Sequence, residues 1–304
     1  MDIFIQQLIN GLVLGSMYAL VALGYTMVYG ILGMINFAHG DVFMIGMFAS
    51  VFALGTLGSM GLAALGIAVP VSLAIAMVVA AGYGWANERI AYRKLRGSHL
   101  LTTLTSAIGM SIVLENFVML SVTKGKIDFP RAAVAPMLAV SWNVGGARVT
   151  LLQVGLLAVT LVMMVGLFWL IHRTRVGIAL RAVSQDRTMA SLVGIDVDRT
   201  IAFTFMLGSA LAAVAGTMVG MYQGVLRFDA GYAIGLKAFT AAILGGIGNV
   251  PGAVLGGLLI GLAEDSTSML IKSEWKNTVA FAILVLVLLV RPRGILGERV
   301  AEKV

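Results

Sequence analysis

The chain has 304 residues, of which 60% are hydrophobic and only 12% are charged. Soluble domains carry about 25% charged residues, so this composition excludes a water-exposed fold and requires a lipid bilayer as solvent. The absence of cysteine excludes disulfides and thiolate metal sites. The net charge of +7 is explained by orientation in a membrane rather than by nucleic-acid binding.

Apolar blocks of membrane-spanning length follow one another along the chain. A spanning helix needs roughly 20 mostly apolar residues, and one of the blocks is long enough for two spans. The pattern predicts an all-α integral membrane protein with about eight hydrophobic segments, forming a single domain over 1–304. The blocks cover residues 8–35, 42–87, 100–123, 149–171, 200–226, 238–263 and 277–290.

Polar residues interrupt the chain after the first block. Asn36, His39 and Asp41 lie there, next to Gly33 and Gly40. Irregular backbone at membrane depth is tolerated only where it is buried in protein or lines a wet cavity. We therefore predict that the three polar residues belong to a translocation pathway or its gate. The alternative is local: Asn36 and Asp41 cap a helix, and His39 binds a backbone carbonyl.

A single charge, Glu115, lies inside the 100–123 block, and Asn116 follows it. A carboxylate at this depth is costly unless it is paired. Lys237 and Arg227 are the predicted partners, and a structural ion pair is favoured over a substrate contact. Glu115 and Asn116 are retained as pathway candidates.

The positions of Lys and Arg predict the orientation. The 84–99 and 172–199 segments and the tail after residue 290 are rich in them, so we place all three in the cytoplasm. The 124–148 segment is placed outside although it is also basic. Three full spans before 84–99 put the N-terminus outside, whereas a re-entrant 36–60 region would reverse that assignment.

A second interruption divides the 238–263 block. Glycines, an asparagine and a proline break a helix, and the flanking pieces are too short to cross a core of about 30 Å separately. With a cytoplasmic tail, the block must return to the side it left, which predicts a re-entrant hairpin. The alternative is one kinked span with the C-terminus outside. The breaking residues assigned to the pathway are Gly245, Gly246, Asn249 and Pro251.

The chain carries no energy source of its own. It has no GxxxxGK[ST] loop for ATP and no chain of buried acidic residues typical of proton-driven pumps. The segment 181–199 is mildly amphipathic, with apolar residues suited to one helix face. It is predicted to insert into a groove on a soluble partner, or else to rest on lipid. These apolar residues are Ala182, Val183, Met189, Leu192 and Val193.

Long stretches of the sequence resemble the LivH-type permeases of bacterial high-affinity branched-chain amino-acid ABC importers. The resemblance covers nearly the whole chain and is weakest near 124–148. The matching stretches are NGLVLGSMYALVALGYTMVYGILGMINFAHGDVFMIG (10–46), SAIGMSIVLEN (106–116), MASLVGIDVDRTIAFTF (189–205), GLKAFTAAILGGIGNVPGAVLGGLLIGLAE (235–264) and RPRGILG (291–297).

The resemblance implies a multi-subunit machine in the bacterial inner membrane. Its partners are a second, related permease, two cytoplasmic ATPases and a periplasmic binding protein that delivers Leu, Ile or Val. This subunit is expected to have no catalytic residue, cofactor or metal. Glu264 and Asp265 are candidate contacts for the binding protein, or else solvated charges at a helix end. Two alternatives remain: the same machine carrying urea, short amides or other amino acids, and a stand-alone secondary transporter or channel.

ABC permeases carry a coupling loop of the form EAA-x-x-x-G, and the resemblance places it within 172–199. Thr188, Met189 and Ala190 occupy the EAA positions, and Gly194 follows at the right spacing. Only Ala190 and Gly194 match the pattern. We expect Gly194 to end a helix. The residues predicted to couple to the ATPases are Arg181, Asp186, Arg187, Met189, Ala190 and Gly194.

Overall fold

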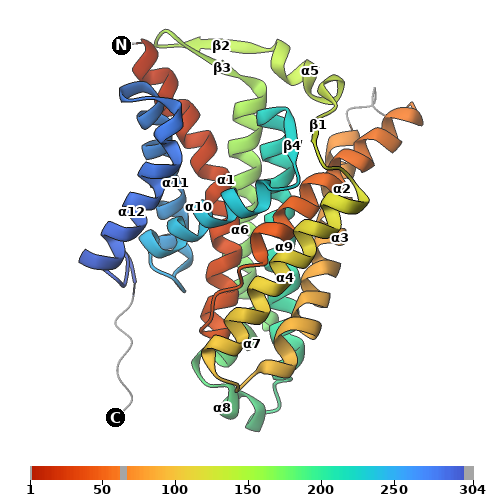
Figure 1. Ribbon diagram of the computed structural model, residues 1–304, viewed down its shortest axis with the longest axis vertical. Coiled ribbons are helices and arrows are strands. Elements are labelled where there is room, and N and C mark those ends of the chain that lie inside the picture. The colour runs from red at the N-terminus through yellow and green to blue at the C-terminus, as the bar shows by residue number, and fades with distance from the viewer. Residues whose placement is uncertain (1, 62–66, 298–304) are drawn as a thin grey trace.

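The computed structural model describes residues 2–61 and 67–297 and is predominantly helical (Figure 1). Within these ranges, eight helices are long and apolar enough to cross a membrane, which confirms the predicted all-α membrane protein. The long helices are α1 (Asp2–Leu32), α2 (His39–Ser59), α3 (Ala68–Asn87), α4 (Leu100–Ser121), α6 (Leu151–Arg173), α9 (Val197–Gln223), α11 (Val250–Leu270) and α12 (Lys276–Val290).

Shorter elements connect the long helices. The antiparallel pair β1–β4 sets Ile127 opposite Leu226, and the β2–β3 hairpin sets Trp142 opposite Val149. The short helices are α5 (Arg131–Ala139), α7 (Arg175–Gln185), α8 (Arg187–Leu192) and α10 (Ala230–Gly245); η2 (Glu88–Tyr92) is a π-helix, and η3 (Arg93–Leu95) and η4 (Ser273–Trp275) are 3-10 helices; the strands are β1 (Lys126–Asp128), β2 (Ser141–Val144), β3 (Ala147–Thr150) and β4 (Val225–Arg227).

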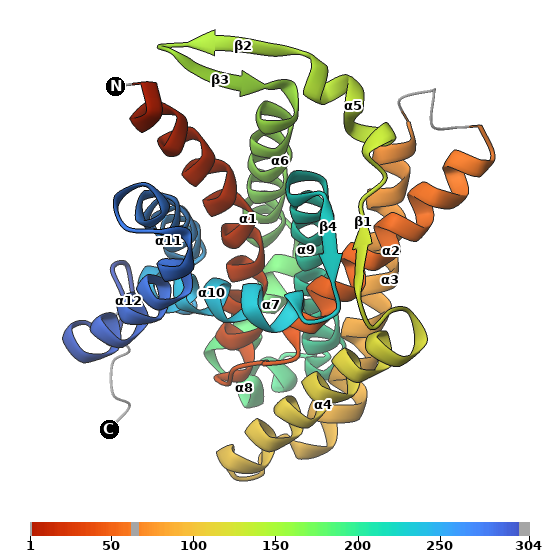
Figure 2. The ribbon, with the colours of Figure 1, turned by 45° about the horizontal axis from the view of Figure 1, so that its top comes forward.

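Several of the connecting elements lie at two opposite ends of the molecule. Helices α7 and α8 lie at one end, which we call the α8 end. Helix α5, the β2–β3 hairpin and the start of α1 lie at the other, the α5 end (Figures 1 and 2). Helices α3 and α6 run toward the α8 end, and α4 and α9 run back. The predicted alternation of the 84–99, 124–148 and 172–199 segments is therefore present.

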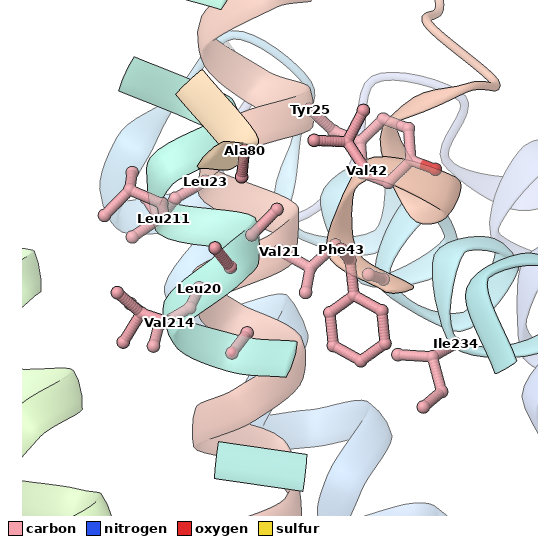
Figure 3. Close-up of a cluster of buried hydrophobic side chains, with 14 of the residues drawn as sticks. Leu20, Val21, Leu23, Tyr25, Val42, Phe43, Ala80, Leu211, Val214 and Ile234 are labelled. Atoms are coloured by element: carbon pink, nitrogen blue, oxygen red, sulfur yellow. The ribbon is translucent and has the colours of Figure 1, made fainter. Parts of the chain in front are cut away.

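Helix α1 is the centre of the core. It packs against α2, α9, α10 and α11, and its middle part is buried on all sides, as expected of a helix with no polar face. Figure 3 shows its side chains against those of four neighbouring helices. The labelled residues are Leu20, Val21, Leu23, Tyr25, Val42, Phe43, Ala80, Leu211, Val214 and Ile234.

Small residues let α1 and α11 approach closely. A Cβ added to Gly261 would lie 2.2 Å from the Cα of Gly15, and one added to Gly257 would lie 2.5 Å from the Cα of Ala19. Both helices thus place a small residue every fourth position along the contact, the pattern that membrane helices use to pack backbone against backbone. This contact fixes α11 beside the central helix.

Two predicted boundaries are wrong. The helical path of α3 continues through η2 and η3 to Leu95, because the charge of Glu88 is satisfied by Arg96 and does not end the helix. The arms of the second interruption are also longer than predicted. Helix α10 has 16 residues and α11 has 21, so α11 alone spans about 31 Å at 1.5 Å per residue.

Candidate functional site

The first interruption, residues 33–38, separates α1 from α2 as predicted. Gly33 has a φ of 69°, a left-handed conformation that glycine adopts at little cost. Ala38 holds the N-cap position of α2 and makes no side-chain capping bond. Asn36 and Asp41 therefore do not cap this helix, so that part of the local alternative is wrong, whereas His39 does have a backbone hydrogen-bond partner, at Val21.

Asn36 and His39 are both buried at this break. The Asn36 Oδ1 accepts a 2.8 Å hydrogen bond from the Tyr92 hydroxyl, which comes from the end of the α3 path. The His39 ring packs edge-on against Tyr25, with 4.7 Å between ring centroids. A Cβ on Gly24 would lie 2.3 Å from His39 Nε2, so the imidazole occupies space that only a glycine leaves open.

Asp41 is fully buried in the first turn of α2. The Ser111 hydroxyl of α4 donates to its Oδ2, while its Oδ1 has no hydrogen-bond partner among the described residues. Glu115, one turn further along α4, is close enough to interact electrostatically with Asp41. Asn116 is exposed and donates to the carbonyl of Ile112 in its own helix. Asp41 and Glu115 thus lie together, and Asn116 points elsewhere.

The cations predicted to pair with Glu115 have other partners. Lys237 of α10 donates to Glu264 Oε1 at 2.8 Å, and Arg227 pairs with Asp229 at 2.5 Å. Glu264 Oε2 also accepts a 2.8 Å bond from the Tyr18 hydroxyl of α1. The buried Lys237–Glu264–Tyr18 group joins α10, α11 and α1, so the predicted ion pair is wrong in its partners.

Glu264 and Asp265 lie within α11 and not at its solvated end. Both are buried, which excludes the alternative that they are solvated helix-end charges in this conformation. The Asp265 Oδ1 lies 3.8 Å from Lys276 Nζ. Contact with a binding protein stays a prediction, and it would require these carboxylates to become accessible.

The second interruption separates α10 from α11 at residues 246–249. A Cβ on Gly245 would lie 1.9 Å from the carbonyl oxygen of Gly252, so the two helices meet backbone to backbone. Gly246 has a φ of 107° and packs against Gly297, to whose nitrogen an added Cβ would come within 2.5 Å. The tight turn therefore requires glycine at positions 245 and 246, because any side chain there would meet the backbone of a neighbouring segment.

Asn249 caps α11 at the same turn. Its Oδ1 accepts from the backbone nitrogen of Gly252 at 2.8 Å, and Pro251 follows in the first turn, where its missing N–H costs nothing. The Asn249 Nδ2 donates to the carbonyl of Leu296 at 3.0 Å. The segment after α12 thus covers this turn. How deeply the α10–α11 pair enters the bilayer stays a prediction.

The predicted coupling segment consists of two helices and not one amphipathic face. Val183 is buried, whereas Met189, Leu192 and Val193 are 63%, 75% and 75% exposed. The chain turns between α7 and α8 at Asp186, whose side chain accepts from the backbone nitrogens of the next turn. The three exposed apolar residues therefore form a separate surface, which we call the α8 surface.

Gly194 ends α8 as predicted. It has a φ of 84°. The Gly194 N–H bonds to the Ser191 carbonyl and the Ile195 N–H to the Ala190 carbonyl, both at 3.0 Å. These two bonds define a Schellman motif, in which a glycine takes the left-handed position. Because glycine adopts this left-handed conformation more readily than other residues, α8 ends at Gly194.

Two arginines bind the predicted coupling segment to the ends of α6 and α1. Arg181 Nη1 donates to the carbonyl of Ile171 at the end of α6, at 2.8 Å. Arg187 Nη2 donates to the carbonyl of Ile31 at the end of α1, at 2.7 Å. The second bond lies two residues before Gly33, so it joins the start of α8 to the chain next to the first interruption.

Three of these residues were missed by the sequence reasoning. Tyr18 and Ser111 lie inside apolar blocks, where a lone hydroxyl is common and carries no spacing signal. Tyr92 was assigned to a cytoplasmic loop. Their roles depend on contacts with Glu264, Asp41 and Asn36, which come from distant parts of the chain.

Comparisons with known proteins match the whole chain. The family model for the permease component of branched-chain amino acid transport systems matches residues 7–288. The permease protein LivH of the high-affinity branched-chain amino acid transport system of Escherichia coli K12 is 48% identical over 306 residues, covering 99% of this chain and 98% of the relative. The corresponding permease protein BraD of Pseudomonas aeruginosa is 46% identical over 301 residues, with the same coverage.

Proposed function

The chain belongs to the family of branched-chain amino acid transport permeases, and from that premise we propose that it is the membrane-spanning subunit of an ABC importer for Leu, Ile and Val. The observation that carries the proposal is the 48% identity to LivH over 99% of the chain. The eight candidate spans supply the membrane path that such a subunit needs. LivH and BraD are both permease proteins of branched-chain amino acid transport systems, which supports these amino acids over urea or short amides as the cargo.

The partners in this proposal are a second, related permease, two ATPases and a periplasmic binding protein. The α8 surface supports the ATPase contact. Three large apolar side chains, those of Met189, Leu192 and Val193, are exposed on a short, capped helix. Exposed apolar anchors of this kind fill pockets on a partner. ATP hydrolysis belongs to those partners, because this sequence has no phosphate-binding loop.

In this proposal the protein lies in the inner membrane, and its α8 end faces the cytoplasm. The Lys and Arg residues of 84–99 and 172–199 lie toward that end, as the positive-inside rule requires. The N-terminus and α5 then face the periplasm, and the C-terminal tail lies in the cytoplasm. The α5 end is accordingly the face on which a binding protein delivers its cargo.

The pathway in this proposal runs past the two interruptions. Asn36, His39 and Asp41 supply buried polar groups at the first, with Glu115 beside Asp41. Irregular backbone and buried polar side chains recur where membrane transporters pass their substrates. Arg187 connects this region to the α8 surface, which gives an ATPase a physical route to the gate.

Uptake in cells tests the function. Labelled leucine, isoleucine, valine and urea are offered to cells that lack this chain and to the same cells complemented with the wild-type chain. We expect uptake of the three amino acids to fall in the deletion strain and to return on complementation, with urea uptake unchanged. Unchanged amino-acid uptake in the deletion strain would contradict the assigned cargo. Co-purification without any ATPase would instead favour a stand-alone carrier.

A further inference from the structure

A cavity with both polar and apolar lining residues lies at the α5 end, separate from both interruptions. Its volume is about 440 Å³, within the roughly 300–1,000 Å³ typical of small-molecule sites. Its walls come from α1, α5, β3, α6 and α9, whose ends meet there (Figure 2). None of the residues predicted from the sequence lines this cavity.

The lining combines three kinds of side chain. Arg148 supplies a cation, Gln153 and Tyr222 supply neutral polar groups, and Leu138 and Leu152 supply an apolar wall. An amino acid with an aliphatic side chain presents a carboxylate, an ammonium and a branched hydrocarbon. A site for it needs a donor, an acceptor and an apolar surface, and this cavity has all three.

The polar wall is held in place before any ligand arrives. The Gln6 and Gln153 amides both donate to Asn10 Oδ1, at 3.2 and 2.9 Å. Gln153 Oε1 accepts from the backbone nitrogen of Thr150 at 2.9 Å, and Gln6 Oε1 accepts from that of Arg148 at 2.8 Å. Side chains that are already fixed lose little freedom on binding, which favours a preformed site.

Arg148 gives the cavity wall a cation, and the carboxylate of Asp265, which does not itself line the cavity, lies near its Tyr222 wall. Arg148 donates through Nε to Ser141 Oγ at 3.0 Å, and its terminal nitrogens have no acceptor within the described part of the chain. A guanidinium whose terminal nitrogens have no acceptor can donate two parallel hydrogen bonds to the carboxylate of a ligand. Tyr222 is close enough to Asp265 to interact electrostatically, and the buried Asp265 Oδ2 has no hydrogen-bond partner in the described ranges.

We propose that this cavity is an entry site that binds the zwitterion of a branched-chain amino acid at the periplasmic face. Arg148 binds the carboxylate, Leu138 and Leu152 contact the aliphatic side chain, and the ammonium lies toward Tyr222 with Asp265 behind it. This inference rests on the proposed function, because it takes the cargo and the orientation of the chain from there.

The natural absence of cysteine allows a direct test. Leu138→Cys places one thiol in this chain at a 40% exposed position on the cavity wall. The assembled importer, in membranes without the binding protein, is treated with a thiol reagent, and modification of this chain is followed with and without leucine. Ser121→Cys, exposed at the end of α4 and outside the cavity, is the matched control.

We expect saturating leucine to slow modification of Leu138→Cys at least threefold and to leave Ser121→Cys unchanged. Adding Arg148→Gln should raise the leucine concentration for half protection about tenfold, the loss expected for one charge-assisted hydrogen bond. Leucinol, which lacks the carboxylate, should protect less well than leucine. The membrane level of the Leu138→Cys chain and its co-purification with the ATPases show that the variant is folded and assembled.

Absence of protection, or protection unaffected by Arg148→Gln, would overturn the entry site. If the wild-type importer still carries leucine, that result leaves the proposed function standing. If the wild-type importer carries no leucine, the proposed function fails, and the entry site fails with it.

Discussion

The Nη2 nitrogen of Arg187, the first residue of α8, donates a 2.7 Å hydrogen bond to the carbonyl oxygen of Ile31, in the last turn of α1. Gly33 follows two residues later with a left-handed φ, and the buried polar break begins there. This bond therefore joins the first residue of α8 to the chain next to the break. Coupling between distant sites requires a contiguous physical connection of this kind.

Replacing Arg187 with Gln should uncouple the importer. The shorter neutral side chain cannot keep the charge-assisted bond to Ile31, a loss of about 1.5–3 kcal/mol. Leucine uptake should fall at least about fivefold while ATP hydrolysis by the purified complex continues. Arg199→Gln is the control, because Arg199 is 89% exposed and pairs only with Asp196, three residues away. Equal uptake in the two variants would contradict the connection.

The effect of replacing Gly194 should depend on whether the new residue tolerates a left-handed backbone conformation, and not on the size of its side chain. An added Cβ would meet no atom within 4 Å, but the φ of 84° disfavours most L-residues. Gly194→Ala should therefore destabilise the end of α8 by about 1 kcal/mol and lower uptake. Gly194→Asn, which tolerates this conformation better, should retain more activity. The membrane level of each variant is measured alongside its uptake. Higher uptake by Gly194→Ala than by Gly194→Asn would contradict this prediction.

The buried pair Lys237–Glu264 should behave differently from the surface pair Arg227–Asp229. Breaking a buried pair by one substitution typically costs about 3–5 kcal/mol, whereas replacing both charges can be nearly neutral. Lys237→Met and Glu264→Gln should each lower the Tm of the solubilised complex strongly, and the double variant should recover much of the loss. Arg227→Gln should change the Tm little. Simple additivity of the two buried substitutions would exclude their direct pairing.

Adding one methyl group at Gly24 should disturb the polar break. The new Cβ would lie 2.3 Å from His39 Nε2 and 3.0 Å from the carbonyl of Gly208, so Gly24→Ala must displace the imidazole from its contact with Tyr25. Uptake should fall severalfold. Gly55→Ala, whose Cβ meets no atom within 4 Å, should leave uptake unchanged. Normal uptake by Gly24→Ala would show that the position of His39 is unimportant.

The local features of the fold were predictable from the sequence because each depends on neighbouring residues. Gly33 and the following polar residues predicted the break between α1 and α2, and the spacing of Gly194 predicted the end of α8. Gly245 and Pro251 likewise predicted the break between α10 and α11. In each case the backbone conformation or a missing N–H dictates the residue type.

Long-range pairings were not predictable in the same way. Charges were taken as the ends of membrane segments, yet Glu88 and Glu264 lie inside helical paths because Arg96 and Lys237 neutralise them. The partner of Lys237 could not be chosen between Glu115 and Glu264 without the packing of α11 on α1. The cavity lined by Arg148 draws on five elements, so no single stretch of sequence indicates it.

ATP-driven uptake by the importer is tested in proteoliposomes that contain the reconstituted complex of this chain, its partner permease and the two ATPases. Labelled leucine is supplied with the binding protein on the face that exposes α5, and ATP is supplied on the face that exposes α8. We predict leucine accumulation that requires both ATP and this chain, with no accumulation of urea. Accumulation that proceeds without ATP, or a complex that carries no branched-chain amino acid, would contradict it.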